Sequence, residues 1–127
     1  MTLKFEPFEQ YQAQAPETIP LPSNYYEDGK ETAVYWLSAS GVLVNSHGCT
    51  IMIDPLLSII SDDPAIGETA ELLMTAPPIM ATQVEKLDAV LYTHTDNDHL
   101  GPITAKELMK TGAHVEPLSV VPWTRRL

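Results

Sequence analysis

Hydrophobic and polar positions divide the chain into a polar opening segment and a body rich in short apolar runs. Residues 1 to about 30 are mostly polar and carry three closely spaced prolines, Pro16, Pro20 and Pro22. Proline fixes φ and lacks an amide proton, so this pattern predicts an extended arm rather than a helix. The tyrosines that could dock it onto the body are Tyr11, Tyr25 and Tyr26. We therefore divide the chain into a polar arm, residues 1–30, and a domain, residues 31–127.

Three apolar runs between Thr32 and Asp54 predict a β-meander. Their lengths and β-branched content are typical of strands: Ala33–Leu37, Val42–Val44 and Thr50–Ile53. The turn before the third run contains Gly48, where a positive φ is expected. Because the runs are apolar on both faces, we expect the strands to be buried between layers. Cys49 is expected to be a small buried strand residue.

The second half alternates helical and strand patterns, which predicts an α/β fold. Two short runs, Leu56–Ile60 and Ala70–Met74, predict helices. Leu87–Thr93 predicts a buried strand that runs directly into His94. A helix is expected to open at Gly101-Pro102 and to stop at Gly112, and a further strand begins near Val115.

Composition excludes several classes of partner. The 127 residues are 44% hydrophobic, with 7 basic and 17 acidic side chains, so the net charge is 7 − 17 = −10. An acidic surface repels phosphate backbones and anionic lipid, which argues against nucleic acid and membrane surfaces. A single cysteine allows no internal disulfide and fits a reducing compartment. The first residues lack a signal-peptide pattern and no run is long enough to span a membrane, so we expect a soluble, cytoplasmic protein.

The candidate chemistry lies in six consecutive residues after the predicted strand. They contain two histidines and two aspartates: His94, Asp96, Asp98 and His99. On an extended segment, His94 and Asp96 share a face, whereas Asp98 and His99 suit a tight turn. Imidazole and carboxylate together suit Zn²⁺, Mn²⁺ or Fe²⁺. Two such ions acidify a water held between them and polarise a substrate oxygen.

This segment resembles the metal-binding signature of the metallo-β-lactamase-fold hydrolases, His-x-His-x-Asp-His after a buried strand. Upstream, Ile51-Met52-Ile53-Asp54-Pro55 resembles a strand of that superfamily that ends in Asp-Pro. The segments Ala76-Pro77-Pro78 and Leu100-Gly101-Pro102 are similar to the branch that contains ascorbate-6-phosphate lactonase and phospholipase-D-like relatives. The resemblance covers about residues 32–114.

The resemblance implies a role for each residue of the cluster. His94 would bind a first metal, with Asp96 where the family usually has a second histidine, which shifts preference from Zn²⁺ towards Mn²⁺ or Fe²⁺. Asp98, the expected catalytic residue, and His99 would bind a second metal. Asp54 would orient a ligand without binding metal itself. An ordinary turn aspartate before Pro55 remains an equal reading of Asp54.

The family takes further ligands from later segments, and after His99 the chain offers only His114, Glu107 and Glu116. We expect His114, like His47, to be an exposed residue. The resemblance thus implies the N-terminal part of an αββα sandwich that carries half of a two-metal site for Zn or Mn. The expected function is ester, lactone or phosphodiester hydrolysis of a small-molecule substrate, with residues 1–127 inactive alone. An uncovered sheet face would favour a homo-oligomer.

Two other functions stay open. One is a non-catalytic remnant of such a hydrolase. The other is a calcium-binding module, because Asp96, Asp98, Gly101 and Glu107 occupy positions one, three, six and twelve of an EF-hand-like loop. Leu100 and Pro102 depart from that loop pattern, and the preceding segment is predicted to be a strand.

Overall fold

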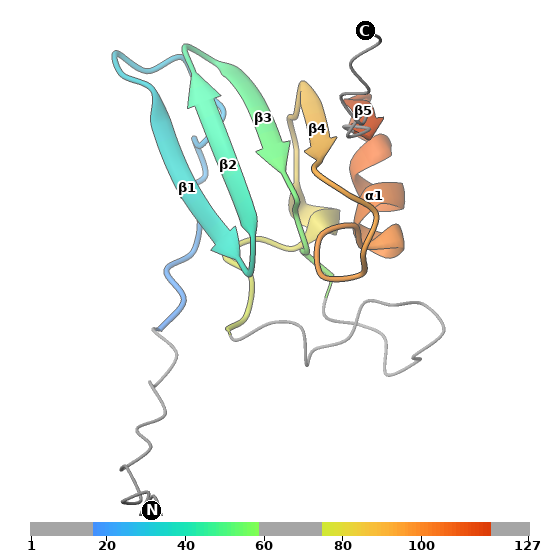
Figure 1. Cartoon of the computed structure of the whole chain (residues 1–127). Helices are drawn as coiled ribbons and strands as arrows, with labels where there is room; N and C mark the ends of the chain where they lie inside the picture. Colours follow the sequence, from blue (N-terminus) through green and yellow to red (C-terminus); the bar gives the residue numbers. More distant parts are fainter. Residues whose placement is uncertain (1–16, 59–74, 118–127) are drawn as a thin grey trace, which may run out of the picture.

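The fold is a mixed sheet that packs against one helix (Figure 1). The computed structural model describes residues 17–58 and 75–117. In these ranges the strands are β1 (Ala33–Ser38), β2 (Gly41–Ser46), β3 (Cys49–Ile53), β4 (Ala89–Tyr92) and β5 (His114–Pro117). The helices are the short 3-10 helix η2 (Ala81–Gln83) and α1 (Pro102–Met109). The strands form one sheet in the order β1-β2-β3-β4-β5, in keeping with the expected α/β class.

The predicted meander is present as β1, β2 and β3, which pair antiparallel. The turn between β2 and β3 places His47 at φ 53° and Gly48 at φ 82°, so the positive φ expected at the glycine is confirmed. The side-chain oxygen of Asn45 accepts the amide of Gly48 at 2.9 Å and closes this turn. Local turn chemistry therefore sets the register of the second hairpin.

Parallel pairing joins β3 to β4 and β4 to β5. The strand predicted over Leu87–Thr93 is confirmed with narrower bounds, Ala89–Tyr92. The predicted helix is confirmed as well, since α1 begins at Pro102, where a missing amide proton costs nothing. Gly112, at φ 81°, ends the turn that follows it. The β4-α1-β5 unit is thus a parallel crossover that brings the β4–α1 loop to one end of the sheet.

One face of the sheet forms the core. Leu43, Met52 and Val90 are aligned across β2, β3 and β4 and have no exposed surface. Leu108 of α1 is also fully buried in this cluster. Thr104 of α1 accepts the amide of Leu57 at 2.9 Å, so the helix also fixes the buried segment after β3.

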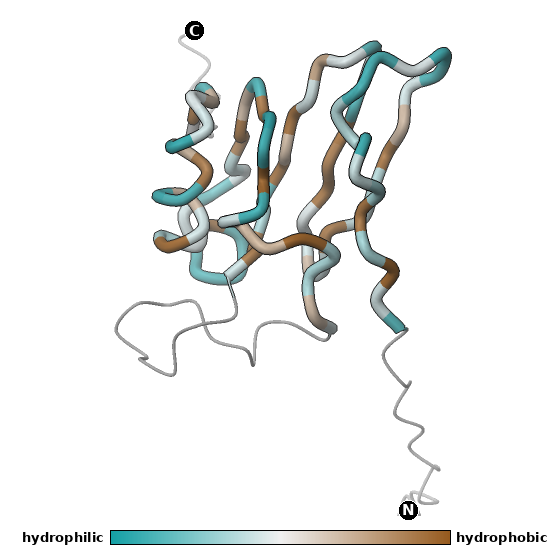
Figure 2. The backbone as a smooth tube through the Cα atoms, turned by 180° about the vertical axis from the view of Figure 1, so that it is seen from behind, coloured by the Kyte–Doolittle hydropathy of each residue, from teal (hydrophilic) through white to brown (hydrophobic). Residues whose placement is uncertain are grey.

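The opposite face of the sheet remains partly open. Val34 and Trp36 on β1 are 66% and 52% exposed, and they are aligned with Val44 and Val42 of β2. The expectation that both faces lie buried between layers is therefore wrong for the described residues, which cover one face only. Figure 2 shows hydrophobic residues recurring along the strands, with more hydrophilic residues at the ends of the sheet.

Two smaller expectations also fail. Cys49 is exposed, because it opens β3 beside the β2–β3 turn rather than in the middle of the strand. Residues 56–58 are buried but form no helix, and their backbone is tied to η2 and α1 instead. The remainder of the first predicted short helix and all of the second lie outside the described residues. No helix in the described part of the chain has the length and apolarity needed to cross a bilayer.

The described part of the arm, residues 17–30, is non-helical, as expected, and Tyr25 docks it onto the domain. Tyr25 is 3% exposed and belongs to the core cluster. Its hydroxyl donates to the carbonyl of Lys86 at 3.1 Å and accepts the amide of Glu85 at 3.2 Å. Its own carbonyl accepts the side-chain amide of Asn45 at 2.6 Å. The arm is therefore held by one buried aromatic residue with satisfied polar groups.

Asp88 connects the antiparallel and parallel parts of the sheet. Its carboxylate accepts the backbone amide of Thr50 at 2.7 Å and the hydroxyl of Thr50 at 3.1 Å. Its carbonyl accepts the amide of His114 at 3.0 Å, so it contacts both neighbours of β4. The backbone hydrogen bond from Thr50 is the main cause that lowers the pKa of Asp88 below its ordinary value.

We predict that Asp88→Ala destabilises the fold by roughly 1 kcal/mol. The cost is modest because the carboxylate is exposed, so water can in part take its place as acceptor for the amide and hydroxyl of Thr50. Folding lowers the pKa of Asp88, so its contribution is full above the unfolded-state pKa of about 3.9 and is lost as pH falls through the folded-state pKa. Urea unfolding at pH 7 and at pH 3 measures both effects. The exposed Asp28→Ala serves as control. A difference between wild type and Asp88→Ala that grows on acidification would contradict this role.

The open sheet face predicts self-association of the chain. Val34 is exposed and its partner Val44 is half-buried, and such a pair drives contact between copies because burial removes apolar surface from water. We expect Val34→Thr with Val44→Thr to weaken association about tenfold, from the transfer free energy of a few buried methyl groups. Sedimentation velocity over a concentration series measures this. Ile19→Thr, an 83% exposed apolar residue of the arm, is the matched control. A monomer at all concentrations would refute the prediction.

Candidate metal centre

The candidate site lies where β3 and β4 end, beside the β1–β2 turn, at the lower edge of the sheet in Figure 1. Since β3 and β4 are parallel, their carboxyl ends reach the same edge. Asp54 follows β3 with φ 47°, a left-handed conformation that a short polar side chain tolerates better than most. Its amide donates to the carbonyl of Leu91 at 2.9 Å, which continues the pairing with β4 by one residue.

The carboxylate of Asp54 is buried and collects hydrogen bonds from two residues beyond β4. Thr93 donates its amide to Oδ1 at 2.7 Å and its hydroxyl to Oδ2 at 2.6 Å. Nδ1 of His99 lies 2.8 Å from Oδ2. Asp54 is only 3% exposed, so these partners take the place of water around the charge. The residue is therefore integrated into the site rather than being only a turn former.

The protonation states of this pair follow from the contacts. Burial alone raises the pKa of Asp54, but the hydrogen bonds from Thr93 and His99 outweigh it and bring that pKa below its ordinary value. A carboxylate can only accept, so Nδ1 of His99 must carry a proton and donate it to Asp54. In a neutral imidazole the lone pair is then on Nε2, on the opposite side of the ring. Asp54 thus fixes which nitrogen of His99 is free to bind a cation.

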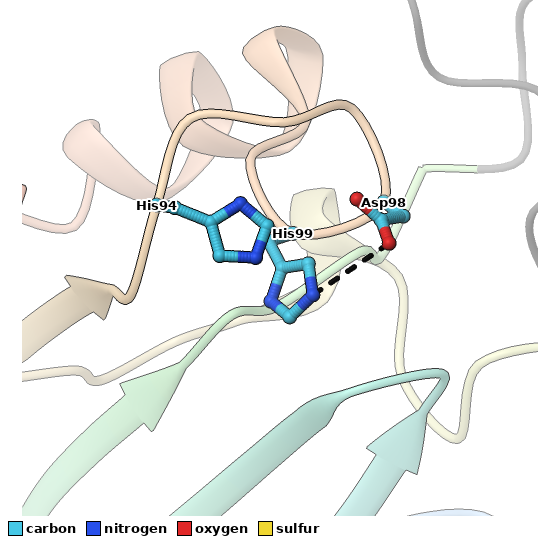
Figure 3. A group of neighbouring side chains, drawn as sticks. All are labelled: His94, Asp98 and His99. Atoms are coloured by element: carbon cyan, nitrogen blue, oxygen red, sulfur yellow. Dashed lines mark ion pairs between the residues drawn. The ribbon is translucent and has the colours of Figure 1, made fainter.

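A tight turn returns the chain to the sheet edge and gathers the other candidate ligands. The carbonyl of Asp96 accepts the amides of His99 and Leu100, both at 2.9 Å. Oδ2 of Asp98 then lies 3.6 Å from Nε2 of His99. The rings of His94 and His99 are 3.8 Å apart between centroids (Figure 3). One ligand atom from each of His94, Asp98 and His99 lies within 4.8 Å of the other two.

This donor set fits a divalent ion such as Zn²⁺ or Mn²⁺. Bond lengths of about 2.1 Å require two ligands of one ion to be no more than about 4.2 Å apart. The 3.6 Å separation between Asp98 and His99 meets this condition. The side chains of His94 and Asp98 are 41% and 61% exposed, so small rotations are open to both. One nitrogen is thus held in advance, while the other two ligands can adjust to the ion.

Asp96 lies outside this group. The turn begins at Asp96, so the alternation of an extended segment does not continue past it. Its carboxylate is 82% exposed and sits 3.4 Å from Nδ1 of His94. The structure therefore brings together three of the four predicted ligands and leaves Asp96 beside the first of them.

The calcium-loop alternative is wrong for this structure. An EF-hand loop needs its twelfth residue to chelate the ion with both carboxylate oxygens. Here Glu107 lies within α1, and both of its oxygens are 2.7 Å from Nζ of Lys110. The segment that would be the second half of the loop is helical from Pro102 onward.

Two contacts of the site had no counterpart in the sequence prediction. Thr93 supplies two of the hydrogen bonds to Asp54, and its position directly after the strand was the available signal. Ser40 of the β1–β2 turn has its hydroxyl 3.5 Å from Nε2 of His99, across 59 residues of sequence, so no local pattern could indicate it. His47 and His114 are exposed, as expected, on the β2–β3 turn and at the start of β5.

Comparison with curated proteins finds relatives without an assigned activity. Uncharacterized proteins of Mycobacterium tuberculosis and Mycobacterium bovis are each 28% identical to the chain over 109 residues. The match covers 84% of this chain and 28% of each relative, so the chain spans little more than a quarter of their length.

A family model places the fold and the site in a wider group. The model for the metallo-beta-lactamase superfamily matches residues 34–113. That range begins in β1, includes Asp54 and the three grouped ligands, and ends just before β5. The mixed sheet with one helix is compatible with part of that fold. The chain belongs to the metallo-beta-lactamase superfamily.

Proposed function

We propose that this chain provides the metal-binding half-site of a hydrolase. The observation that carries the proposal is the pairing of Asp54 with His99 at 2.8 Å, next to the group of His94, Asp98 and His99. A buried carboxylate that fixes a histidine tautomer is the arrangement by which proteins prepare a metal ligand. Superfamily membership supports the same reading.

Each residue has a definite part in the proposal. His94, Asp98 and His99 hold Zn²⁺ or Mn²⁺, with two ions in the complete fold, and Asp54 orients His99. When bound, a divalent ion acidifies water and polarises the substrate oxygen. Asp98 is the proposed catalytic residue, and in this proposal its exposed carboxylate accepts a proton from attacking water. Asp96 is a weaker candidate ligand, because its carboxylate lies beside His94 and would have to move together with that side chain to reach the ion.

For the bond that is cleaved, we propose only a chemical class. An ester, a lactone or a phosphodiester in a small molecule is the substrate that this chemistry serves. The resemblance of short sequence segments to the branch of ascorbate-6-phosphate lactonase and phospholipase-D-like relatives favours the lactone or the phosphodiester. The net charge of −10 argues against nucleic acid and anionic membranes as partners.

We propose a cytoplasmic location, because the only cysteine of the chain is an exposed free thiol, which suits a reducing compartment.

Metal binding tests the proposed site. We predict that the purified chain binds Mn²⁺ or Zn²⁺ and that Asp98→Ala with His99→Ala lowers the affinity by more than about tenfold. Asp96→Ala is the matched control from the same loop, with an expected change below about threefold, because its carboxylate lies outside the ligand group. Calorimetric titration of apo protein measures all three. Equal heats for wild type and the double variant would reject the site.

Catalysis is expected to need more than this half-site. Two-metal hydrolysis requires ions held about 3.5–4 Å apart, and a misplacement of about 1 Å can cost on the order of a hundredfold in rate. The described residues offer three grouped ligand atoms, too few to fix two ions.

We therefore predict that residues 1–127, loaded with Mn²⁺ or Zn²⁺, hydrolyse a simple lactone or bis(p-nitrophenyl) phosphate no faster than free metal. Initial rates at matched metal concentration, for wild type and His94→Ala, provide the measurement. A wild-type excess that disappears in His94→Ala would show that the half-site is active alone or is completed by a second copy.

A further inference from the structure

The β1–β2 turn has features that hairpin formation alone does not require. Ser38 and Ala39 have φ of 90° and 45°, left-handed values that residues with a side chain adopt at a cost. The register of β1 and β2 is also irregular between Trp36 and Ser38. Strained backbone of this kind persists only where surrounding contacts enforce it, and it concentrates near functional sites.

The contacts that enforce this turn come from both sides. The indole nitrogen of Trp36 donates to the carbonyl of Ala39 at 3.0 Å, and the hydroxyl of Ser38 donates to the carbonyl of Thr75 at 3.3 Å. A Cβ added at Gly41 would lie 3.3 Å from the carbonyl oxygen of Asp54. The turn is therefore seated directly against the residue that orients His99.

This placement presents one hydroxyl to the metal ligands. The side-chain oxygen of Ser40 is 3.5 Å from Nε2 of His99, the nitrogen that Asp54 leaves free for a cation. In the neutral imidazole with its proton on Nδ1, Nε2 carries the lone pair, so Ser40 is the donor in this contact. The contact is long and Ser40 is exposed, so little is lost when the hydroxyl turns to another acceptor.

The charges around the cluster set the conditions under which an anion could bind beside that hydroxyl. Asp54, Asp96 and Asp98 make this end of the sheet anionic. Among the described residues no lysine forms an ion pair with these three carboxylates, and Lys86 and Lys110 bind Gly48 and Glu107 instead. An anionic group bound here would depend on the metal ion and on neutral donors. The hydroxyl of Thr93 lies 3.2 Å from Nδ1 of His99 but already donates to Asp54, whereas the hydroxyl of Ser40 lies on the Nε2 side of the ring.

We propose that Ser40 is an oxyanion-contacting residue, whose hydroxyl donates to a phosphate or carboxylate oxygen of a ligand held at the metal centre. The proposal rests on the proposed function, because it needs a cation at His94, Asp98 and His99. It assigns the β1–β2 turn to substrate binding and assigns an anionic substituent to the substrate.

The test measures anion affinity separately from metal affinity. The Mn²⁺-loaded chain, freed of excess metal, is titrated with inorganic phosphate and followed by calorimetry and by the Mn²⁺ paramagnetic resonance signal. The variants are Ser40→Ala, Ser40→Thr, which keeps the hydroxyl, and Ser46→Ala, an exposed serine at the end of β2 farthest from the cluster. Thermal melts verify that each variant is folded.

We expect Ser40→Ala to weaken phosphate binding about tenfold, with Mn²⁺ affinity unchanged within about twofold, as for the loss of one hydrogen bond to a charged group. Ser40→Thr and Ser46→Ala should bind phosphate like the wild type.

Unchanged phosphate affinity in Ser40→Ala, with normal Mn²⁺ binding, would overturn the role of Ser40 and leave the metal site intact. Loss of Mn²⁺ affinity in Ser40→Ala would also overturn it, because the serine would then support the metal site itself. A wild-type chain that binds no Mn²⁺ would reject the proposed function and this inference together.

Discussion

The charge on Asp54 is the constraint around which this molecule is arranged. A carboxylate with almost no solvent contact is tolerated only where hydrogen-bond donors replace its water, and Thr93 and His99 supply them. Both donors come from the segment after β4, so the same contacts that stabilise the buried charge also fix where that segment starts. The loop that follows is then short enough for its turn to return His99 to the sheet edge. The hydrogen bonds that stabilise the buried carboxylate of Asp54 are therefore also the ones that position His99.

That arrangement divides the candidate site into a rigid part and an adjustable part. His99 is held by Asp54 on one ring nitrogen and is only 20% exposed along its side chain. His94 and Asp98 are much more exposed and have contacts only within their own loop. A site built in this way determines the direction of one metal bond and lets an incoming ion set the others. Such a design accommodates ions of different radius, in keeping with a donor set that does not by itself select zinc or manganese.

Much of this could be predicted from local pattern, and the remainder depends on contacts distant in sequence. The strands of the meander, β4, and the start of α1 follow from hydrophobic runs and from the placement of Gly48 and Pro102. The burial of the two sheet faces could not be predicted, because Val34 and Leu43 look equally apolar. Which of them is covered depends on the face against which Tyr25, η2 and α1 pack. Asp96 and Asp98 also look alike in the sequence, and only the turn that begins at Asp96 separates the candidate ligand Asp98 from Asp96. Ser40 reaches His99 through the overall topology, which no short window of sequence contains.

The docking of Tyr25 has a consequence for how the limits of this domain should be drawn. The match to the family model begins at residue 34. The phenol of Tyr25, which lies before that range, nevertheless fills part of the core and donates a hydrogen bond to the carbonyl of Lys86, just before β4. Asn45 of β2 in turn binds the backbone of the arm at two carbonyls. The packed unit is accordingly larger than the range that the family model matches, and the match to the mycobacterial relatives, which covers 84% of the chain, also extends beyond that range. Residues outside the range of the family model thus belong to the same packed core, and a substitution in such a segment would alter stability without touching any candidate ligand of the metal centre.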